Sequence, residues 1–365
     1  MLKKSSNNIR FAYNNFIGKK YPISLIHFVT MRCNARCSFC FIDFDDPKTF
    51  KNELTVDEIR EMSRSLGSSL KNINITGGEP FARKDLKEII DIYYSNTSID
   101  SIFITSNGSL TDRIEELIKF KENKFKNKKL IFSYSLDDYP ENHNKVRKIK
   151  NLFETCIESY NLTKDFSNNV FGNVSITVSQ ENYENVVDIY NYLKSIGISS
   201  ITACLVRDEG VYKIPPDHKN QILAAYKRLT NLIIEDINSG QMIGYNQNSI
   251  LGRVMNEKNK IMYKNIGRVY LDNSFISPCT AGATFGVIYS NGDVFPCEIL
   301  EQKKLGNLRD YKMNFLDLWL DDKAQTTKKW VRDSKCSCSF ECAWSYNILS
   351  NVQYTPRLVK SAIGL

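Results

Sequence analysis

The sequence predicts an α/β fold, namely an open, partial (β/α)6 TIM-like barrel followed by a small second domain. Apolar segments alternate six times with segments of helical periodicity over residues 21–240. This alternation favours a parallel sheet with right-handed crossovers. Six units are fewer than the eight of a closed barrel. After about residue 260 the alternation gives way to a predicted hairpin and a cysteine-rich tail.

The individual elements follow from local signals. Thr55 is the expected N-cap of the first helix, because Glu58 three residues later completes a capping box. Asn291-Gly292 between two apolar runs predicts the hairpin, and one helix is expected over residues 315–330. The predicted strands are 23–30, 73–76, 102–105, 130–136, 174–178 and 201–206. The predicted domains are an N-terminal extension (1–20), the barrel (21–240) and the second domain (241–365).

Composition excludes several classes of protein. Hydrophobic residues make up 42% and charged residues 25% of the chain, which is typical of a globular protein. The net charge of +8 is mild and comes without a regular basic and aromatic stripe, so no nucleic-acid partner is expected. Residues 1–10 lack the apolar core of a signal peptide, and no run reaches the roughly 18 apolar residues of a membrane span. A cytoplasmic location is therefore expected, in which ten cysteines indicate metal ligands or reduced thiols.

Three cysteines follow the first predicted strand. Cys33, Cys37 and Cys40 have C-x3-C-x2-C spacing, and the aromatic Phe39 precedes the last of them. Thiolates are the usual ligands of iron–sulfur clusters. Because no fourth ligand lies nearby, the set predicts an iron with an open position, by the same reasoning that separates open from closed zinc sites. The alternative is a zinc site, which would need a fourth ligand.

With this spacing the sequence resembles the radical S-adenosylmethionine (SAM) superfamily, which places such a loop after the first barrel strand. Thr-Gly-Gly-Glu-Pro at residues 76–80 follows the second predicted strand, as the GGEP motif does in that family. The glycines also suit close approach of the chain to a ligand. The resemblance implies a [4Fe–4S] cluster that binds SAM and cleaves it reductively, giving a 5′-deoxyadenosyl radical that abstracts hydrogen from a substrate carbon.

The resemblance also implies which residues lie near SAM. Ser106 and Asn107 match a ribose contact, while Ser135 and Arg147 match the pair that holds the SAM carboxylate. The alternative for Arg147 is a surface position on a helix. The whole predicted SAM set is Gly77, Gly78, Glu79, Pro80, Phe39, Ser106, Asn107, Ser135 and Arg147. No catalytic acid or base is singled out.

A second group of cysteines occupies the C-terminal region and resembles the SPASM/twitch extension of the same superfamily. It comprises Cys279, Cys297, Cys336, Cys338 and Cys342, with Gly292 five residues before Cys297. A full SPASM extension has seven cysteines, so five imply one auxiliary [4Fe–4S] cluster. Cys279, Cys297 and Cys342 are the favoured ligands, and Cys336 or Cys338 supplies the fourth. A zinc site is the alternative. Cys156 and Cys204 are expected to be buried thiols.

Three functions remain open at this stage. The favoured one is oxidation or rearrangement of a small metabolite of sugar, cyclitol or nucleotide type, because only about twenty residues precede the first strand, too few for a leader-peptide-binding domain. The second is modification of a peptide or protein, by thioether or carbon–carbon crosslinking, epimerisation or formylglycine formation. The third is a non-catalytic iron–sulfur or zinc scaffold. The expected partners are the small-molecule or peptide substrate and an electron donor of flavodoxin or ferredoxin type.

Overall fold

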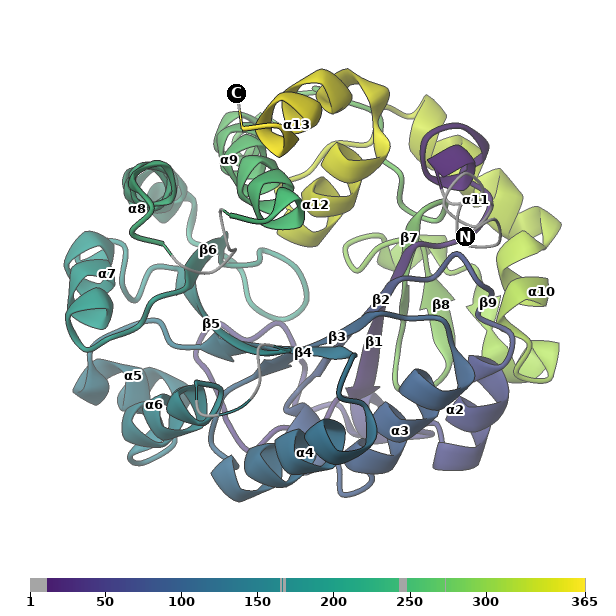
Figure 1. The fold of residues 1–365 in the computed structure, drawn as a ribbon, viewed down its shortest axis with the longest axis horizontal. Helices are drawn as coiled ribbons and strands as arrows, with labels where there is room; N and C mark the ends of the chain where they lie inside the picture. The colour runs from purple at the N-terminus through teal and green to yellow at the C-terminus, as the bar shows by residue number, and fades with distance from the viewer. Residues whose placement is uncertain (1–11, 165, 167–168, 243–247, 273, 365) are drawn as a thin grey trace.

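The centre of the molecule is a curved sheet whose six N-terminal strands are parallel (Figure 1). The structure, a computed structural model, describes residues 12–164, 166, 169–242, 248–272 and 274–364. The six strands are neighbours in the order β6-β5-β4-β3-β2-β1, so the predicted partial barrel is confirmed. They are β1 (Ser24–Thr30), β2 (Asn72–Gly77), β3 (Ser101–Ser106), β4 (Lys129–Ser135), β5 (Val170–Val178) and β6 (Ile201–Leu205).

Helices cover the outer face of this sheet, as Figure 1 shows for α2 to α7. They bury apolar stripes against the strands, because a helix with one apolar face is stable only when that face is covered. The helices of the barrel are α2 (Val56–Ser63), α3 (Leu86–Asn96), α4 (Thr111–Lys124), α5 (Pro140–Arg147), α6 (Leu152–Leu162), α7 (Val186–Ser195) and α8 (Lys219–Ser239). The capping box of Thr55 and Glu58 is present at the start of α2, as predicted.

The C-terminal region continues the sheet. Strand β7 (Phe285–Ile288) pairs in parallel with β1, and β8 (Asp293–Phe295) and β9 (Gly306–Asn307) add antiparallel strands. The hairpin at Asn291-Gly292 is therefore confirmed. The single helix expected over 315–330 is wrong. The chain forms α10 (Phe315–Leu320) and α11 (Asp322–Asp333), because the extended backbone of Asp321 ends the first helix and its carboxylate caps the second by accepting from Lys323 N.

Helices α9 (Ile250–Val269), α12 (Glu341–Ser350) and α13 (Thr355–Ala362) lie beside the open edge of the barrel (Figure 1). Side chains from α9, from α12 and from the segment after α8 satisfy the backbone of β6, an edge strand of the sheet. Alternate N–H groups of β6 donate to side chains from beyond the barrel, with Ile201 to Met242 Sδ (3.2 Å), Ala203 to the Tyr263 hydroxyl (3.5 Å) and Leu205 to Glu341 Oε1 (2.8 Å). The C-terminal part of the chain thus closes the side of the barrel.

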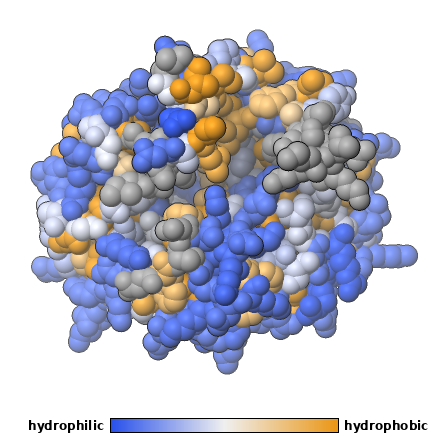
Figure 2. Space-filling model, in the orientation of Figure 1, coloured by the Kyte–Doolittle hydropathy of each residue, from blue (hydrophilic) through white to orange (hydrophobic). Residues whose placement is uncertain are grey.

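The surface is mostly polar on the face shown in Figure 2, with apolar side chains gathered in smaller areas. Among the described residues, no helix is long and apolar enough to cross a bilayer. The domain limits stay a prediction, and residues 1–11 of the predicted N-terminal extension lie outside the described residues.

Candidate active site and auxiliary cluster site

The loop with the first three cysteines begins where β1 ends, at the carboxyl edge of the parallel sheet. Helix α5 holds it in place: Arg36 N donates to the Arg147 carbonyl and Ser38 N to the Val146 carbonyl, both at 3.2 Å. The thiols of Cys33, Cys37 and Cys40 are close enough to act electrostatically on one another. The structure therefore brings the three predicted ligands together.

Burial governs the ionisation of these thiols. It raises the pKa of Cys33 to about 12 and raises the pKa values of Cys37 and Cys40 as well. Without a metal the thiols are therefore protonated at neutral pH. A cluster is bound by thiolates, so its binding must release these protons. Coordination to iron, and not exposure to water, is therefore what ionises these three thiols.

Arg147 lies at the end of α5 and points toward the cysteine loop. It is buried, with 6% of its surface exposed. Its guanidinium donates to Asp137 Oδ2 at 2.9 and 2.6 Å and approaches Cys37 Sγ at 3.8 Å. The ring of Phe39 lies 5.6 Å from the guanidinium carbon. The alternative of a surface helix position is therefore wrong, and Arg147 brings a positive charge next to a predicted cluster ligand.

The two glycines of the GGEP segment let β2 approach the cysteine loop. A Cβ on Gly77 would lie 1.9 Å from the Thr30 carbonyl oxygen, and one on Gly78 would lie 2.3 Å from that of Arg32. Both neighbours are backbone atoms that cannot move aside cheaply. Gly78 N and Glu79 N donate to these same two oxygens at 2.9 Å. In this structure the glycines permit close approach of two chain segments, whereas the sequence suggested approach to a ligand.

Glu79 is a buried carboxylate at the centre of this edge. It accepts hydrogen bonds from Phe81 N (3.0 Å), the Ser106 hydroxyl (2.9 Å) and Asn107 N (2.7 Å). Pro80 is the first residue of the short turn that follows. Burial raises the pKa of Glu79 to about 7, although the three hydrogen bonds oppose this shift. Ser106 and Asn107 therefore hold Glu79.

Asn107 also reaches the cysteine loop. Its Nδ2 donates to Asn34 Oδ1 at 2.9 Å, and Asn34 donates in turn to Ser109 Oγ at 2.8 Å. Ser135 is the last residue of β4, where it pairs with Ser175 of β5. All residues of the predicted SAM set except Arg147 and Phe39 thus lie at or just beyond the carboxyl ends of β2, β3 and β4. Their roles toward SAM stay predictions.

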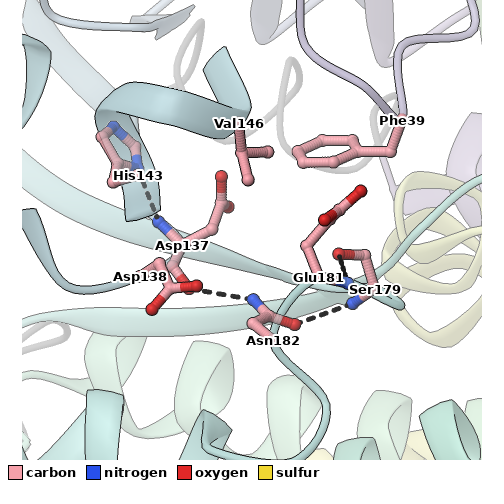
Figure 3. Close-up of a pocket in the computed structure, with 8 residues that line it drawn as sticks. All are labelled: Phe39, Asp137, Asp138, His143, Val146, Ser179, Glu181 and Asn182. Atoms are coloured by element: carbon pink, nitrogen blue, oxygen red, sulfur yellow. Dashed lines mark hydrogen bonds between the residues drawn. The ribbon is translucent and has the colours of Figure 1, made fainter. Parts of the chain in front are cut away.

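A small pocket lies beside Phe39, between the cysteine loop and the ends of β4 and β5 (Figure 3). Its lining is acidic, and Glu181 accepts a hydrogen bond from Ser38 of the cysteine loop at 2.7 Å. Carboxylates suit the hydroxyl and amino groups of a ligand, because they accept hydrogen bonds. The lining residues are Phe39, Asp137, Asp138, His143, Val146, Ser179, Glu181 and Asn182.

The five C-terminal cysteines gather between the sheet and the C-terminal helices, around an apolar cluster that includes Phe285 and Val331. The thiols of Cys279 and Cys336 are in hydrogen-bonding contact, and both interact electrostatically with Cys297 and Cys338. Cys342 differs from these four cysteines in the groups that surround its thiol. The charged groups that act most on it are Glu298, Arg207 and Glu341.

The two groups of cysteines offer thiol donors, which are the usual ligands of iron–sulfur clusters. A [4Fe–4S] cluster is larger than a single metal ion, and its thiolates bind separate irons. The donor sets, three thiols in one loop and five in another region, therefore fit iron–sulfur clusters.

Two family models match the chain. The model of the radical SAM superfamily matches residues 28–204, and that of the SPASM iron–sulfur cluster-binding domain matches residues 279–343. The chain therefore combines a radical SAM domain with a SPASM domain. It is an enzyme whose radical SAM domain binds a [4Fe–4S] cluster and SAM, and its SPASM domain is an iron–sulfur cluster-binding domain. The non-catalytic scaffold is thereby excluded, whereas the number of auxiliary clusters stays a prediction.

Similar proteins include enzymes with different substrates. A GTP 3′,8-cyclase of Tolumonas auensis is 40% identical over 90 residues, which span 24% of this chain and 27% of that relative. The structure titled native anSMEcpe with bound AdoMet has a TM-score of 0.61 at 20% identity and covers 94% of this chain and 100% of its own. SuiB of Streptococcus suis, bound to the precursor peptide SuiA, has a TM-score of 0.57 at 18% identity and covers 88% and 69%. At these identities the two structures show a shared fold.

Several residues of this radical SAM site escaped the sequence analysis. Asp137 pairs with Arg147, Asn34 links the cysteine loop to Asn107, and Glu298 pairs with Arg207. Asp137 carried a usable signal, because it is a polar residue just past the end of a predicted parallel strand, where ligands bind in α/β folds. Asn34 and Glu298 each directly follow a cysteine that is a predicted ligand, and their partners lie on other elements.

Proposed function

We propose that this radical SAM enzyme abstracts a hydrogen atom from a carbon of a small polar metabolite of sugar, cyclitol or nucleotide type. When bound, the cluster and SAM supply the hydrogen-abstracting radical. The observation that carries the proposal is the position of Arg207, just past the end of β6. It forms an ion pair with Glu298, and its guanidinium lies 4.5 Å from the Phe41 ring centre and 4.9 Å from that of Phe340.

Each partner of Arg207 is a neighbour of a predicted cluster ligand. Phe41 follows Cys40, Glu298 follows Cys297, and Phe340 lies between Cys338 and Cys342. Arg207 therefore lies where the two cysteine regions meet. A substrate at this point would be within reach of both regions, which is what a hydrogen abstraction followed by electron transfer to a second cluster requires.

A pocket opens next to Arg207 and has an acidic lining. Carboxylates accept hydrogen bonds from hydroxyl groups, so this lining suits a polyol such as a sugar or cyclitol. Burial raises the pKa of Glu341 to about 7, so this group exchanges a proton near neutral pH. The pocket is lined by Leu205, Val206, Arg207, Asp208, Glu209, Tyr270, Ile299, Cys338, Ser339, Phe340 and Glu341.

The second candidate is modification of a peptide or protein. It is supported by the fold shared with anSMEcpe, whose structures include one with the Kp18Cys peptide (TM-score 0.59, 21% identity, covering 94% of this chain and 100% of that one). One mode of peptide binding is disfavoured, because the edge of β6 already donates to side chains and cannot take an added strand.

Isotope transfer from a fractionated extract separates the two candidates. Cells of the source organism are grown on a deuterated carbon source, and the cell extract is divided by size into a metabolite fraction and a polypeptide fraction. The reconstituted enzyme, SAM and dithionite are added to each fraction, and deuterium in 5′-deoxyadenosine is measured by mass spectrometry. The proposal expects deuterium from the metabolite fraction. Deuterium from the polypeptide fraction alone would support the second candidate and overturn the first. A Cys37→Ala variant is the blank.

A further inference from the structure

Lys258 is a buried cation on α9 that lacks a carboxylate partner. Only 5% of its surface is exposed, and its ammonium donates to Ser345 Oγ on α12 at 3.3 Å. Within the part of the chain that the structure describes, it forms no ion pair. Lys260, two residues along the same helix, shows the ordinary arrangement: it is paired with Glu257 at 3.0 Å and also donates to Asn238.

An ammonium group buried without a counter-charge is strongly unfavourable, because it loses its hydration and gains nothing in return. Ser345, which accepts from Lys258, lies three residues after Cys342 on α12, so the ammonium is on the side of that helix that carries Cys342, and the charge of the Cys342 thiol acts on it. A neutral thiol cannot balance an ammonium, whereas a thiolate can. Cys342 also acts on Arg207, but that guanidinium is already paired with Glu298.

We propose that Lys258 is a positioning residue of the auxiliary iron–sulfur cluster, whose ammonium compensates the negative charge of the Cys342 thiolate that ligates it. Cys342 is then one of the four ligands. The thiols of Cys279 and Cys336 touch each other, so one of these two is the fifth cysteine, which does not bind the cluster. Reduction adds a negative charge to a cluster, and a nearby cation stabilises that charge. Lys258 therefore raises the reduction potential of the auxiliary cluster. This inference does not depend on which substrate the enzyme binds.

The test uses the full chain with Cys33, Cys37 and Cys40 all replaced by Ala, so that only the auxiliary cluster contributes a signal. Lys258→Met removes the charge and keeps a long unbranched side chain, Lys258→Arg keeps the charge, and Lys260→Met is the control on the same helix. Each variant is titrated with dithionite and followed by electron paramagnetic resonance. The midpoint potential should become more negative in Lys258→Met alone. A Lys258→Met potential equal to that of the parent would overturn the proposal.

Iron content keeps the test decisive where the cluster is lost. If Lys258→Met loses iron while Lys258→Arg retains it, and far-ultraviolet circular dichroism shows both folded, the charge is what matters and the proposal stands. If both variants lose iron, packing is the cause and the proposal fails. Cys342→Ala, with Lys258 unchanged, should also lower auxiliary iron. Full iron in Cys342→Ala would show that this cysteine is the spare thiol and would overturn the proposal independently.

Discussion

The loop with Cys33, Cys37 and Cys40 and the C-terminal thiol site differ in how their ligands are brought together. The first site draws three thiols from eight consecutive residues, and neighbouring elements only orient the loop. The second draws on three separate segments, at Cys279, at Cys297 and at 336–342. A site within one loop leaves a coordination position open to a ligand. A site surrounded by packed segments favours full coordination by protein side chains. The predictions below test this contrast.

The largest effect is expected from removing one ligand of each site. Cys37→Ala should abolish formation of 5′-deoxyadenosine from SAM, because only the first site is predicted to bind SAM. Cys297→Ala should remove the auxiliary iron and leave the uncoupled cleavage of SAM in place, since Cys297 lies in the other region. Chromatography of the nucleoside product, with iron assays, checks both. Loss of SAM cleavage in Cys297→Ala would contradict the separation of roles.

Gly78→Ala should displace the cysteine loop without touching a ligand. The new methyl group would lie 2.3 Å from the Arg32 carbonyl oxygen, so one of the two segments must move. Iron content should fall from about eight atoms per chain to about four, those of the auxiliary cluster. Gly267→Ala on α9 is the matched control, because its methyl group would meet only the flexible side chain of Lys227. Equal iron in both variants would refute the role of Gly78.

Arg147→Met should destabilise the barrel rather than the C-terminal site. It leaves the Asp137 carboxylate buried without its partner, and breaking a buried ion pair in this way costs about 3–5 kcal/mol. Urea unfolding of the cluster-free protein measures the loss. The double variant Arg147→Met with Asp137→Asn should regain part of it, because no unpaired charge remains. A loss below about 1 kcal/mol would mean that the pair is open to water.

Glu79 should make stability depend on pH. Its folded pKa of about 7 lies above the ordinary value of 4.5, so the folded state binds the proton more tightly. The stabilisation is full below pH 4.5 and is lost as pH rises through 7. The unfolding free energy of the cluster-free parent, minus that of Glu79→Gln, should decrease by about 2–3 kcal/mol between pH 5 and pH 8. A difference that does not vary with pH would show that Glu79 titrates normally.

The contrast between a site within one loop and a site built from separate segments also explains what the sequence could and could not predict. The strands, the capping box at Thr55 and the predicted ligands Cys33, Cys37 and Cys40 follow from residues near one another in the chain. The partner of Arg147 and the serine that Lys258 contacts come from different elements, so they appear only once tertiary packing is known. The split of residues 315–330 was missed because one side chain, Asp321, overrode a continuous helical pattern.

The smallest effect is expected at Cys204, which tests whether the barrel contributes a ligand to the C-terminal site. Its thiol lies among groups of the neighbouring strand β5, at 3.5 Å from Thr177 Oγ1 and 3.7 Å from Ser175 Oγ, although its charge also acts on Cys342. Cys204→Ala should therefore keep the full iron content and lose about 1 kcal/mol of stability, the cost of a weak hydrogen bond and a small cavity. A loss of iron would instead make Cys204 a ligand, and the C-terminal site would then close around a residue of the barrel itself.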